Sequence, residues 1–522
     1  MKLNIQDTFN KEIKADVNRN NTRRQVMDAG FSFVTPTRPS MPELIHVSQE
    51  MLEAIGLEMA DAKSPEFLSL FTGLKTYVGS DPYAMCYGGH QFGHWAGQLG
   101  DGRAINLMEV VHNNNRWALQ LKGAGATPYS RTADGLAVLR SSIREHLCSE
   151  AMYHLGVPTT RSLSLSLSGD QVFRDMMYDG NGDYEKGAIV CRVAQSFIRF
   201  GNFQIFASRG DTKNLKSLAD YTIKYFYPSI DAPDDKNKYL KFFEMVSQNT
   251  LDMIIHWQRV GFVHGVMNTD NMSILGLTID YGPYGWLEGF DKTWTPNTTD
   301  RQQARYRYGN QIGIGLWNLY QLANALVLLI KSTEELEDLL EKYKLNSRQQ
   351  FAQMMRSKIG LIKTLDTDLS LIQSLENSLA LIETDMTIFY RLLSSIDSSD
   401  SPEQALEKIT DAFYEPNMLS ESVSKQWKNW LDQYQKRLAK EETDPHERSA
   451  QMNAVNPKYV LRNYMAQLAI DDANKGDYGL VEELHDLLKK PYKEQLEHEK
   501  WFAKRPEWAR HKVGCSMLSC SS

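Results

Sequence analysis

The chain contains 522 residues, of which 42% are apolar and 24% charged, a composition typical of a globular protein with roughly two to four domains. Its net charge of −7 gives no basic footprint for a polyanion and argues against a nucleic-acid-binding protein, without excluding a local basic pocket. Its five cysteines form no CxxC pair and no zinc spacing, so neither a disulfide scaffold nor a zinc module is predicted.

The beginning of the chain carries no chemical pattern. The stretch from Met1 to Asp16 has neither the apolar core of a signal peptide nor the acid-poor character of a transit peptide. We therefore expect a cytoplasmic protein.

A glycine-rich stretch from Tyr87 to Arg103 is the first segment with a chemical pattern. Glycine permits backbone conformations with positive φ and lets a ligand come close to main-chain N–H groups. Gly100, Gly102 and Arg103 would suit a phosphate cradle, because two positions without side chains precede a guanidinium that can fork onto oxygens. Glycine-rich hairpins without any ligand are also common.

A strand and a helix are predicted next. The alternation of apolar and polar residues from Trp117 to Lys122 predicts a strand that projects Lys122 from the face opposite the core. Apolar residues at helical spacing predict a helix from about Leu136 to Leu155. Glu145 flanks the apolar stripe of this helix, where it could turn inward to meet Lys122. A solvated strand end and a surface glutamate are the alternatives.

Two arginines follow a second pair of predicted strands, around Arg161 to Leu167 and Ala188 to Val193. Arg192 and Arg199 would share one face of a helix but lie on opposite faces of a strand. Beside an acidic, metal-binding cleft they would clamp phosphates, whereas alone they would be surface cations.

The stretch from Val263 to Asp280 places two acids and an amide around apolar residues. Asp270 and Asn271 lie in a polar turn, and the residues after them predict a pair of short buried strands that would fold Asp280 back towards Asn271. Carboxylate and amide oxygens brought together suit Mg²⁺, as in a protein-kinase-like cleft. From this stretch alone, ordinary turn residues are the commoner interpretation.

The other segments are predicted to be helical. Helices are expected from Leu215 to Tyr227, from Tyr239 to Val260, and through most of the chain after residue 316. The most apolar of them, Leu316 to Ile330, is shorter than the ~20 residues of a membrane span and is predicted to be a buried core helix.

Several runs of sequence resemble the selenoprotein O family. They include G-H-Q-F-G, W-A-G-Q-L-G-D-G-R, Q-L-K-G-A-G-x-T-P-Y-S-R, V-H-G-V-M-N-T-D-N-M and D-Y-G-P-Y-G, and with the C-terminal C-S-S they extend in order over residues from about 80 to 522. The resemblance implies a protein-kinase-like fold, similar to a pseudokinase in lacking the usual catalytic HRD aspartate. It also implies transfer of AMP from ATP to protein hydroxyls, with the nucleotide flipped in the cleft.

The same resemblance implies a role for each candidate residue. Lys122 resembles the strand lysine that contacts the nucleotide phosphates, Glu145 its helix partner, and Asp270 the proton acceptor. Asn271 and Asp280 resemble the ligands of Mg²⁺ or Mn²⁺, and Asp280 also approaches the nucleotide. The other implied nucleotide contacts are Gly100, Gly102, Arg103, Asp134, Gly135, Arg192 and Arg199.

Cys520 stands where some relatives carry selenocysteine. In some bacterial members, the resemblance implies, a disulfide joins this tail to a cysteine in the loop after the metal-binding acid. Pro296 stands here where that cysteine is expected, so we do not expect this form of redox control. A bond between Cys515 and Cys520, a bond to a partner, and two idle thiols are the alternatives.

The predicted fold class is α+β: a protein-kinase-like bilobal fold with an N-lobe β-sheet, a helical C-lobe and additional C-terminal helices. The predicted domains are an N-terminal extension (1–80) packing on the core, an N-lobe (81–200), a helical C-lobe with the metal-binding Asp and Asn (201–400), and a C-terminal helical region with the cysteine-containing tail (401–522).

The predicted function is a protein adenylyltransferase that uses ATP with Mg²⁺ or Mn²⁺ and modifies Ser, Thr or Tyr hydroxyls of proteins, with neither nucleic acid nor membrane as a partner. The alternatives are a uridylyltransferase using UTP, an ordinary phosphotransferase, and a nucleotide-binding pseudokinase that acts as a binding module. The complete set of Lys122, Glu145, Asn271 and Asp280 favours a working enzyme, since a binding module has no need of both metal ligands.

Overall fold

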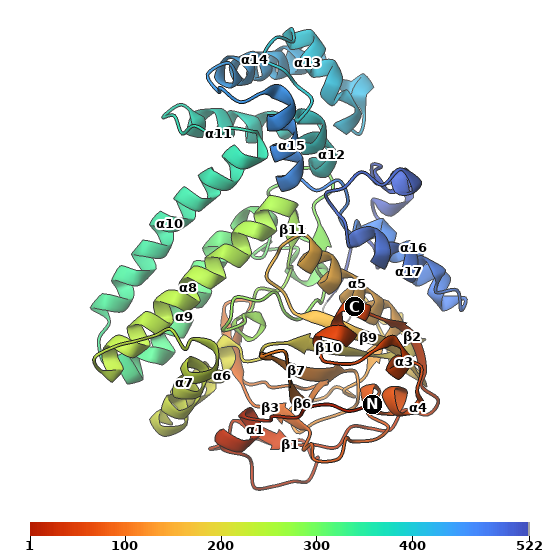
Figure 1. The fold of residues 1–522 in the computed structure, drawn as a ribbon, viewed down its shortest axis with the longest axis vertical. Coiled ribbons are helices and arrows are strands. Elements are labelled where there is room, and N and C mark those ends of the chain that lie inside the picture. Colours follow the sequence, from red (N-terminus) through yellow and green to blue (C-terminus); the bar gives the residue numbers. More distant parts are fainter. Residues whose placement is uncertain (520–522) are drawn as a thin grey trace.

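The computed structural model describes residues 1–519, and its N-terminal part is built around an antiparallel β-sheet (Figure 1). Seven strands follow the order β1-β3-β6-β7-β10-β9-β2, and β8 pairs with β10. Their bounds are β1 Phe31–Phe33, β2 Glu43–Val47, β3 Tyr83–Met85, β6 Ala104–His112, β7 Asn115–Lys122, β8 Ala137–Val138, β9 Arg161–Arg174 and β10 Asp183–Ala194. A small hairpin of β4 (Gly88–Gln91) and β5 (His94–Gln98) lies outside this sheet.

The first 80 residues contribute both ends of this strand order. β1 pairs with β3 at one end, and β2 pairs with β9 at the other. The same segment also forms the short helices α1 Phe9–Glu12, α2 Gln49–Ala54, α3 Met59–Ala62 and α4 Pro65–Phe71. The proposed division of the chain into an extension and three further domains stays a prediction.

The predicted Lys122 strand is confirmed as β7, a central strand of the sheet. Lys122 is its last residue and lies opposite Ala104 of β6 and Val190 of β10. β7 alternates as expected, but both of its faces are covered from Ala118 onward, so the end of the strand is buried rather than solvated. The sheet therefore holds the lysine in place from both sides.

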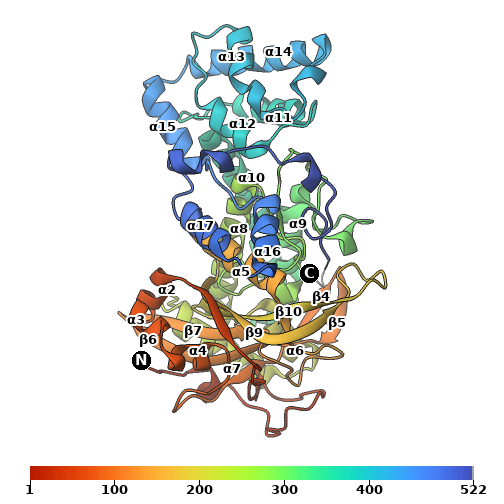
Figure 2. The same ribbon diagram turned by 90° about the vertical axis from the view of Figure 1, so that its right-hand side faces the viewer.

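The predicted helix from 136 to 155 is confirmed as α5 (Leu139–His154), which packs against β9 and β10. Its other side is covered by α16 (Asn463–Asn474) and α17 (Gly479–Leu488), which lie next to α5 in Figure 2. Nearly every residue of α5 is buried, including Glu145. The helix that carries Glu145 is thus enclosed between the sheet and the C-terminal helices.

Long helices make up the middle of the chain. α8, α9 and α10 run side by side in Figure 1, and α6 packs against α7 and α9. Their bounds are α6 Phe200–Ser208, α7 Thr212–Phe226, α8 Asp235–Val260, α9 Gln311–Ile330 and α10 Glu334–Lys358. The predicted core helix begins earlier than expected, at Gln311, and contacts α6, α8 and α10. The stretch Tyr308–Ile330 is long and apolar enough to cross a membrane by length and composition, with 44% of its apolar window buried inside the protein.

A further group of helices lies farthest from the sheet, at the top of Figure 1. Its bounds are α11 Asp368–Leu379, α12 Met386–Leu393, α13 Pro402–Ile409, α14 Glu421–Leu438 and α15 Pro445–Val455. Trp427 and Trp430 of α14 are buried at its centre. The expected α+β fold class is confirmed by this separation of an N-terminal sheet from a helical remainder.

The predicted pair of strands between Met272 and Ile279 is wrong. Gly276 turns the chain with a φ of +67°, and the two halves bond to other segments instead of to each other. Ile274 N donates to Ile198 O at 3.0 Å, and Thr278 N donates to Pro158 O at 2.9 Å. Because neighbouring segments already satisfy these backbone groups, no hairpin is needed.

The C-terminal tail returns to the loop that contains Pro296. Leu518 N donates to Pro296 O at 3.0 Å, and Thr298 N donates to Leu518 O at 2.7 Å. The tail therefore lies along the loop where the resemblance places a regulatory cysteine in relatives. Cys520, on which the redox alternatives depend, lies outside the described residues.

Candidate active site

Lys122 and Glu145 form a buried ion pair between β7 and α5. Lys122 Nζ lies 2.5 Å from Glu145 Oε2, and both side chains are buried. Burial lowers the pKa of Lys122, as do Arg103 and Arg192, while the attraction of Glu145 opposes this shift. Glu145 thus turns inward as expected, and the pair orients the ammonium group.

Two arginines converge on the carboxylate of Asp280. Arg192, in β10, donates from Nη1 to Asp280 Oδ1, and Arg199, immediately before α6, donates from its own Nη1 to Asp280 Oδ2. Arg192 Nη1 also lies 3.2 Å from Glu145 Oε1. Lys122, Glu145, Arg192, Arg199 and Asp280 therefore form one network, which we call the charged cluster.

The charged cluster sets the ionisation of Asp280. Burial alone would raise the pKa of this carboxyl, but Arg199, Arg192 and Lys122 together hold it well below its usual range. The backbone of Asp280 has a φ of +56°, a left-handed conformation that aspartate tolerates better than most residues. Asp280 is therefore a permanent anion surrounded by three cations.

The turn that contains Asp270 and Asn271 lies beside the charged cluster. Arg199 Nη1 donates to the backbone oxygen of Asp270 at 2.8 Å while it also contacts Asp280, so one guanidinium joins the two acids predicted to work together. Asp270 accepts from Gln91 Nε2 at 3.1 Å through Oδ2, whereas its buried Oδ1 has no hydrogen-bond partner among the described residues. Burial raises the pKa of Asp270 to about 6.

The donor set of Asn271 and Asp280 fits a hard divalent cation. Asn271 Nδ2 donates to Val266 O at 2.9 Å, which leaves the amide oxygen without a hydrogen bond among the described residues. The two arginines use one lone pair on each oxygen of Asp280, and a carboxylate offers about four. Oxygen ligands are those that Mg²⁺ and Mn²⁺ prefer.

The glycine-rich hairpin docks onto this turn. His90 N donates to Thr269 Oγ1 at 2.7 Å, and Phe92 N donates to Asn268 Oδ1 at 3.1 Å. A Cβ at Gly89 would lie 2.7 Å from Asp270 Oδ1, so only glycine permits this approach. The hairpin thus covers Asp270.

The loop after the hairpin carries the predicted phosphate cradle. Gly100 has a φ of +121°, and a Cβ there would lie 2.5 Å from the ring of Tyr129. Gly102 packs less closely against the same residue, with a Cβ there 3.0 Å from the backbone oxygen of Tyr129. Arg103 lies beside the charged cluster, because its backbone oxygen accepts from the N–H of Gly123, the residue after Lys122, at 2.8 Å. The guanidinium of Arg103 has no hydrogen bond or ion pair within residues 1–519.

Asp134 and Gly135 make their contacts with residues outside the charged cluster. Asp134 is 42% exposed and forms a salt bridge of 2.7 Å with Arg174. No hydrogen bond or ion pair between described residues joins it to the charged cluster. Gly135 packs tightly against Gly125, where a Cβ would lie 2.3 Å from backbone atoms. The structure thus brings together the lysine, the glutamate, both arginines and the acids, while Asp134 and Gly135 border a neighbouring loop.

Three polar residues of the site were missed by sequence reasoning. Arg192 Nη2 donates to Gln120 Oε1, Gln91 donates to Asp270, and the buried Asp101 lies 3.9 Å from Arg199. Gln120 could have been found, because it lies two positions before Lys122 and therefore on the same face of β7. Asp101 carried a weaker signal, as an acid within the glycine-rich stretch.

Comparisons with known proteins cover the whole of this region. A family described as "Protein adenylyltransferase SelO" matches residues 16–489. A protein nucleotidyltransferase YdiU from Flavobacterium johnsoniae is 59% identical over 520 residues, which cover 100% of this chain and 99% of the relative. Proteins of the same name from Rhodopirellula baltica and an Azoarcus species are 53% and 52% identical, again over 100% of this chain and 99% of each relative.

Proposed function

The chain belongs to the protein adenylyltransferase SelO family, and we propose on this basis that the charged cluster serves the transfer of AMP from ATP to protein hydroxyls. The chain is a nucleotidyltransferase, and its α+β fold agrees with the kinase-like fold of the family. ATP as the donor, Mg²⁺ or Mn²⁺ as the cation, and Ser, Thr or Tyr as acceptors are the finer parts of the proposal.

The observation that carries the proposal is the convergence of three buried cations, Lys122, Arg192 and Arg199, on one carboxylate. Transfer of AMP requires pyrophosphate to leave from the α-phosphorus, and its charge must be neutralised where it forms. An ordinary kinase arrangement uses mainly the lysine and metal ions for this purpose. The two additional buried arginines therefore favour a binding mode in which the β- and γ-phosphates of the nucleotide lie deep in the site.

Each residue of the site then has a task. The acceptor hydroxyl oxygen attacks the α-phosphorus, its proton passes to Asp270, and the bond from the α-phosphorus to the bridging oxygen breaks as pyrophosphate leaves. Asp270 is suited to accept this proton because its buried Oδ1 has no other partner among the described residues. Lys122, Arg192 and Arg199 would neutralise the leaving pyrophosphate, with Glu145 keeping the lysine in place. Asn271 and Asp280 would hold the divalent cation, which supplies further charge neutralisation at the phosphates.

ATP labelled separately at the α and γ positions distinguishes the reactions. Protein should take up the α label, gain the mass of an adenylyl group and release pyrophosphate. Uptake of the γ label with release of ADP would identify an ordinary phosphotransferase and refute the proposal. A parallel reaction with α-labelled UTP tests the choice of nucleotide, since preferential uptake from UTP would identify a uridylyltransferase.

We place the enzyme in the cytoplasm, where ATP is available to it. Its similar relatives are bacterial proteins, which agrees with this location.

A further inference from the structure

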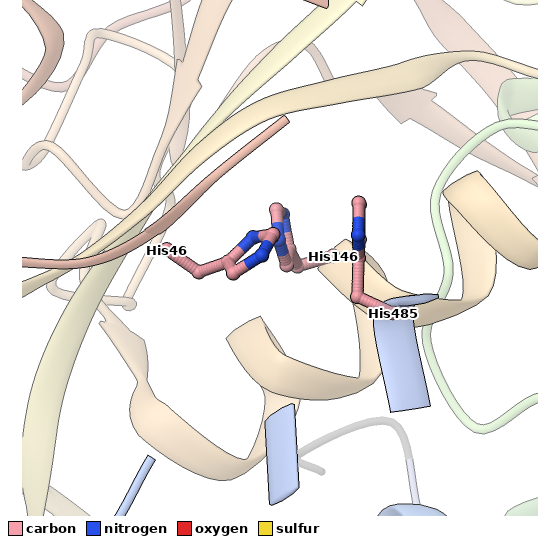
Figure 3. A group of neighbouring side chains, drawn as sticks. All are labelled: His46, His146 and His485. Atoms are coloured by element: carbon pink, nitrogen blue, oxygen red, sulfur yellow. The ribbon is translucent and has the colours of Figure 1, made fainter. Parts of the chain in front are cut away.

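Three histidines from distant parts of the sequence meet outside the charged cluster. His46 comes from β2, His146 from α5 and His485 from α17 (Figure 3). Each offers one ring nitrogen, and these three atoms all lie within 4.8 Å of one another. We call this group the histidine cluster. No step of the proposed transfer uses it.

The hydrogen bonds of His146 direct one nitrogen towards the other rings. His146 Nδ1 lies 2.6 Å from Ser162 Oγ, and His146 Nε2 lies 2.8 Å from His46 Nδ1. When His146 Nδ1 donates to the serine hydroxyl, Nε2 carries the lone pair that faces the cluster. A hydrogen bond of this kind behind an imidazole is the usual way in which a protein orients a metal-binding histidine.

His485 has no polar partner although it is buried. Only 1% of its side chain is exposed, and neither ring nitrogen has a hydrogen bond among the described residues. The nearest acidic oxygens, on Asp486 and Glu150, lie 3.9 and 4.0 Å away. Most buried polar groups in proteins are hydrogen-bonded, and leaving one unpaired destabilises the folded state. The unpaired nitrogens of His485 therefore call for a ligand.

We propose that the histidine cluster binds a divalent transition-metal ion of the zinc class, with His46, His146 and His485 as ligands. Imidazole nitrogens suit Zn²⁺, whereas Mg²⁺ takes oxygen ligands. Tetrahedral bonds of about 2.0–2.1 Å hold ligand nitrogens about 3.3 Å apart. That separation falls between the 2.8 Å hydrogen bond and the 4.8 Å limit of the group. The rings of His146 and His485 lie nearly parallel, with an interplanar angle of 12°, so binding requires them to rotate until their lone pairs converge on the ion.

The surroundings suit three neutral imidazoles with a water as the fourth ligand. Burial lowers the pKa of His46 to about 4 and lowers those of His146 and His485 as well, so all three are available as ligands near neutral pH. Glu150 is the nearest carboxylate to His485 Nε2, but it already accepts hydrogen bonds from Arg161, Ser48 and the backbone of Ser162. We therefore assign the fourth position to water.

A bound ion would join three segments that are far apart in sequence. β2 lies within the first 80 residues, α5 carries Glu145, and α17 lies near the end of the chain. Since an ion that binds only the folded state stabilises it, Zn²⁺ should raise the Tm of the full-length protein.

The test uses Zn²⁺ and Co²⁺ alone as probes, with the metal-stripped full chain and excess Mg²⁺ to occupy oxygen sites. Wild-type protein should bind one equivalent of Zn²⁺, raise its Tm on binding, and give the visible absorption of four-coordinate Co²⁺. His46→Gln and His485→Gln should each bind at least tenfold more weakly. His112→Gln, which alters a half-buried histidine outside the cluster, should behave as wild type.

A gain-of-signal variant keeps the test independent of folding defects. His485→Cys retains a metal ligand, so its Co²⁺ complex should show an added sulfur-to-metal absorption band. The proposal is overturned if the wild-type protein does not bind Zn²⁺ more tightly than the His485→Gln variant does. It is also overturned if His485→Cys binds Co²⁺ without that band.

Discussion

Asp280 is the residue at which the two buried arginines of the candidate site meet. Its carboxylate accepts from Arg192 and Arg199, and the same arginines reach Glu145 and the backbone of Asp270. In the proposed transfer, each positive charge would already be placed near the phosphate that it neutralises, so little reorganisation would be needed during the reaction.

Asp280→Ala should lower adenylyl transfer by about 100-fold or more, since the cation ligand and the partner of two arginines are lost together. Transfer of the α label and Mg²⁺-dependent binding of ATP are the measurements. Asp280→Asn keeps the shape of the side chain but removes its charge, so it should also be inactive, and its Tm should fall because Arg192 and Arg199 lose their shared anion. Normal turnover in the Ala variant would remove Asp280 from the mechanism.

Asn271→Ala should be only partly defective, because Asp280 remains as a ligand. The Mg²⁺ concentration that gives half-maximal transfer should rise in this variant. An unchanged Mg²⁺ requirement would argue that Asn271 is an ordinary turn residue.

Lys122→Ala should lose transfer while the fold persists. Glu145 keeps Arg192 at 3.2 Å after this change, so its buried carboxylate is not left unpaired. Circular dichroism and the Tm report the fold, and transfer of the α label reports activity. An unfolded variant would assign Lys122 a structural role at the end of β7 instead.

At the scale of elements, two loops meet behind the candidate phosphate contacts. Gly100 and Gly102 pack against Tyr129, and Ser130 Oγ donates to Gly102 O. The position of Arg103 therefore depends on how closely these loops approach each other.

Gly100→Ala should shift this contact and weaken ATP binding. Gly97→Ala is its matched control, because Gly97 also has a positive φ, +74°, but no atom within 4 Å of the added Cβ. Backbone strain should cost Gly97→Ala about 1–2 kcal/mol. It should cost Gly100→Ala at least as much, because a φ of +121° lies farther from the left-handed helical region. Crowding against Tyr129 should add roughly 1–3 kcal/mol in Gly100→Ala alone. Equal Tm values and equal Kd values for ATP in the two variants would contradict this account.

Hydrophobic periodicity was sufficient to predict the elements whose tertiary contacts favour the same secondary structure as the local sequence does. The alternation in β7 and the apolar stripe of α5 both reflect burial against the same sheet, so each could be predicted from sequence. The segment from Met272 to Ile279 looked equally apolar, but its backbone partners are Ile198 and Pro158. Distant partners of this kind leave no periodic signal.

The candidate site shows the same limit. Residue types predicted oxygen ligands at Asn271 and Asp280, and spacing allowed Glu145 to meet Lys122. The spacing of Arg192 and Arg199 fitted a shared face only in a helix. In the structure, Arg192 lies in strand β10 and Arg199 lies immediately before α6. Their meeting at Asp280 depends on tertiary structure, which only the resemblance to a family supplied in advance.

At the scale of the whole molecule, the four cysteines within residues 1–519 are protected. Cys86, Cys148, Cys191 and Cys515 are buried, and burial raises the pKa of each, to about 11 for Cys86 and Cys515. Since the thiolate is the reactive form, these cysteines should resist oxidation near neutral pH.

Activity should therefore differ little with and without dithiothreitol, because Pro296 stands where the family resemblance leads us to expect the cysteine that pairs with the tail. Cys520→Ser should leave both activities alike. A large rise on reduction that disappears in the Cys520→Ser variant would show that another thiol forms a regulatory bond with the tail.

The packing of α16 and α17 against α5 also has a consequence for the order of events during synthesis. A ribosome makes the sheet, α5 and all the candidate active-site residues before it makes the two helices that cover α5. Until those helices emerge, one side of the helix that carries Glu145 is exposed to water. A nascent chain therefore holds every candidate active-site residue before it holds the support that fixes them, and activity should begin only as translation ends.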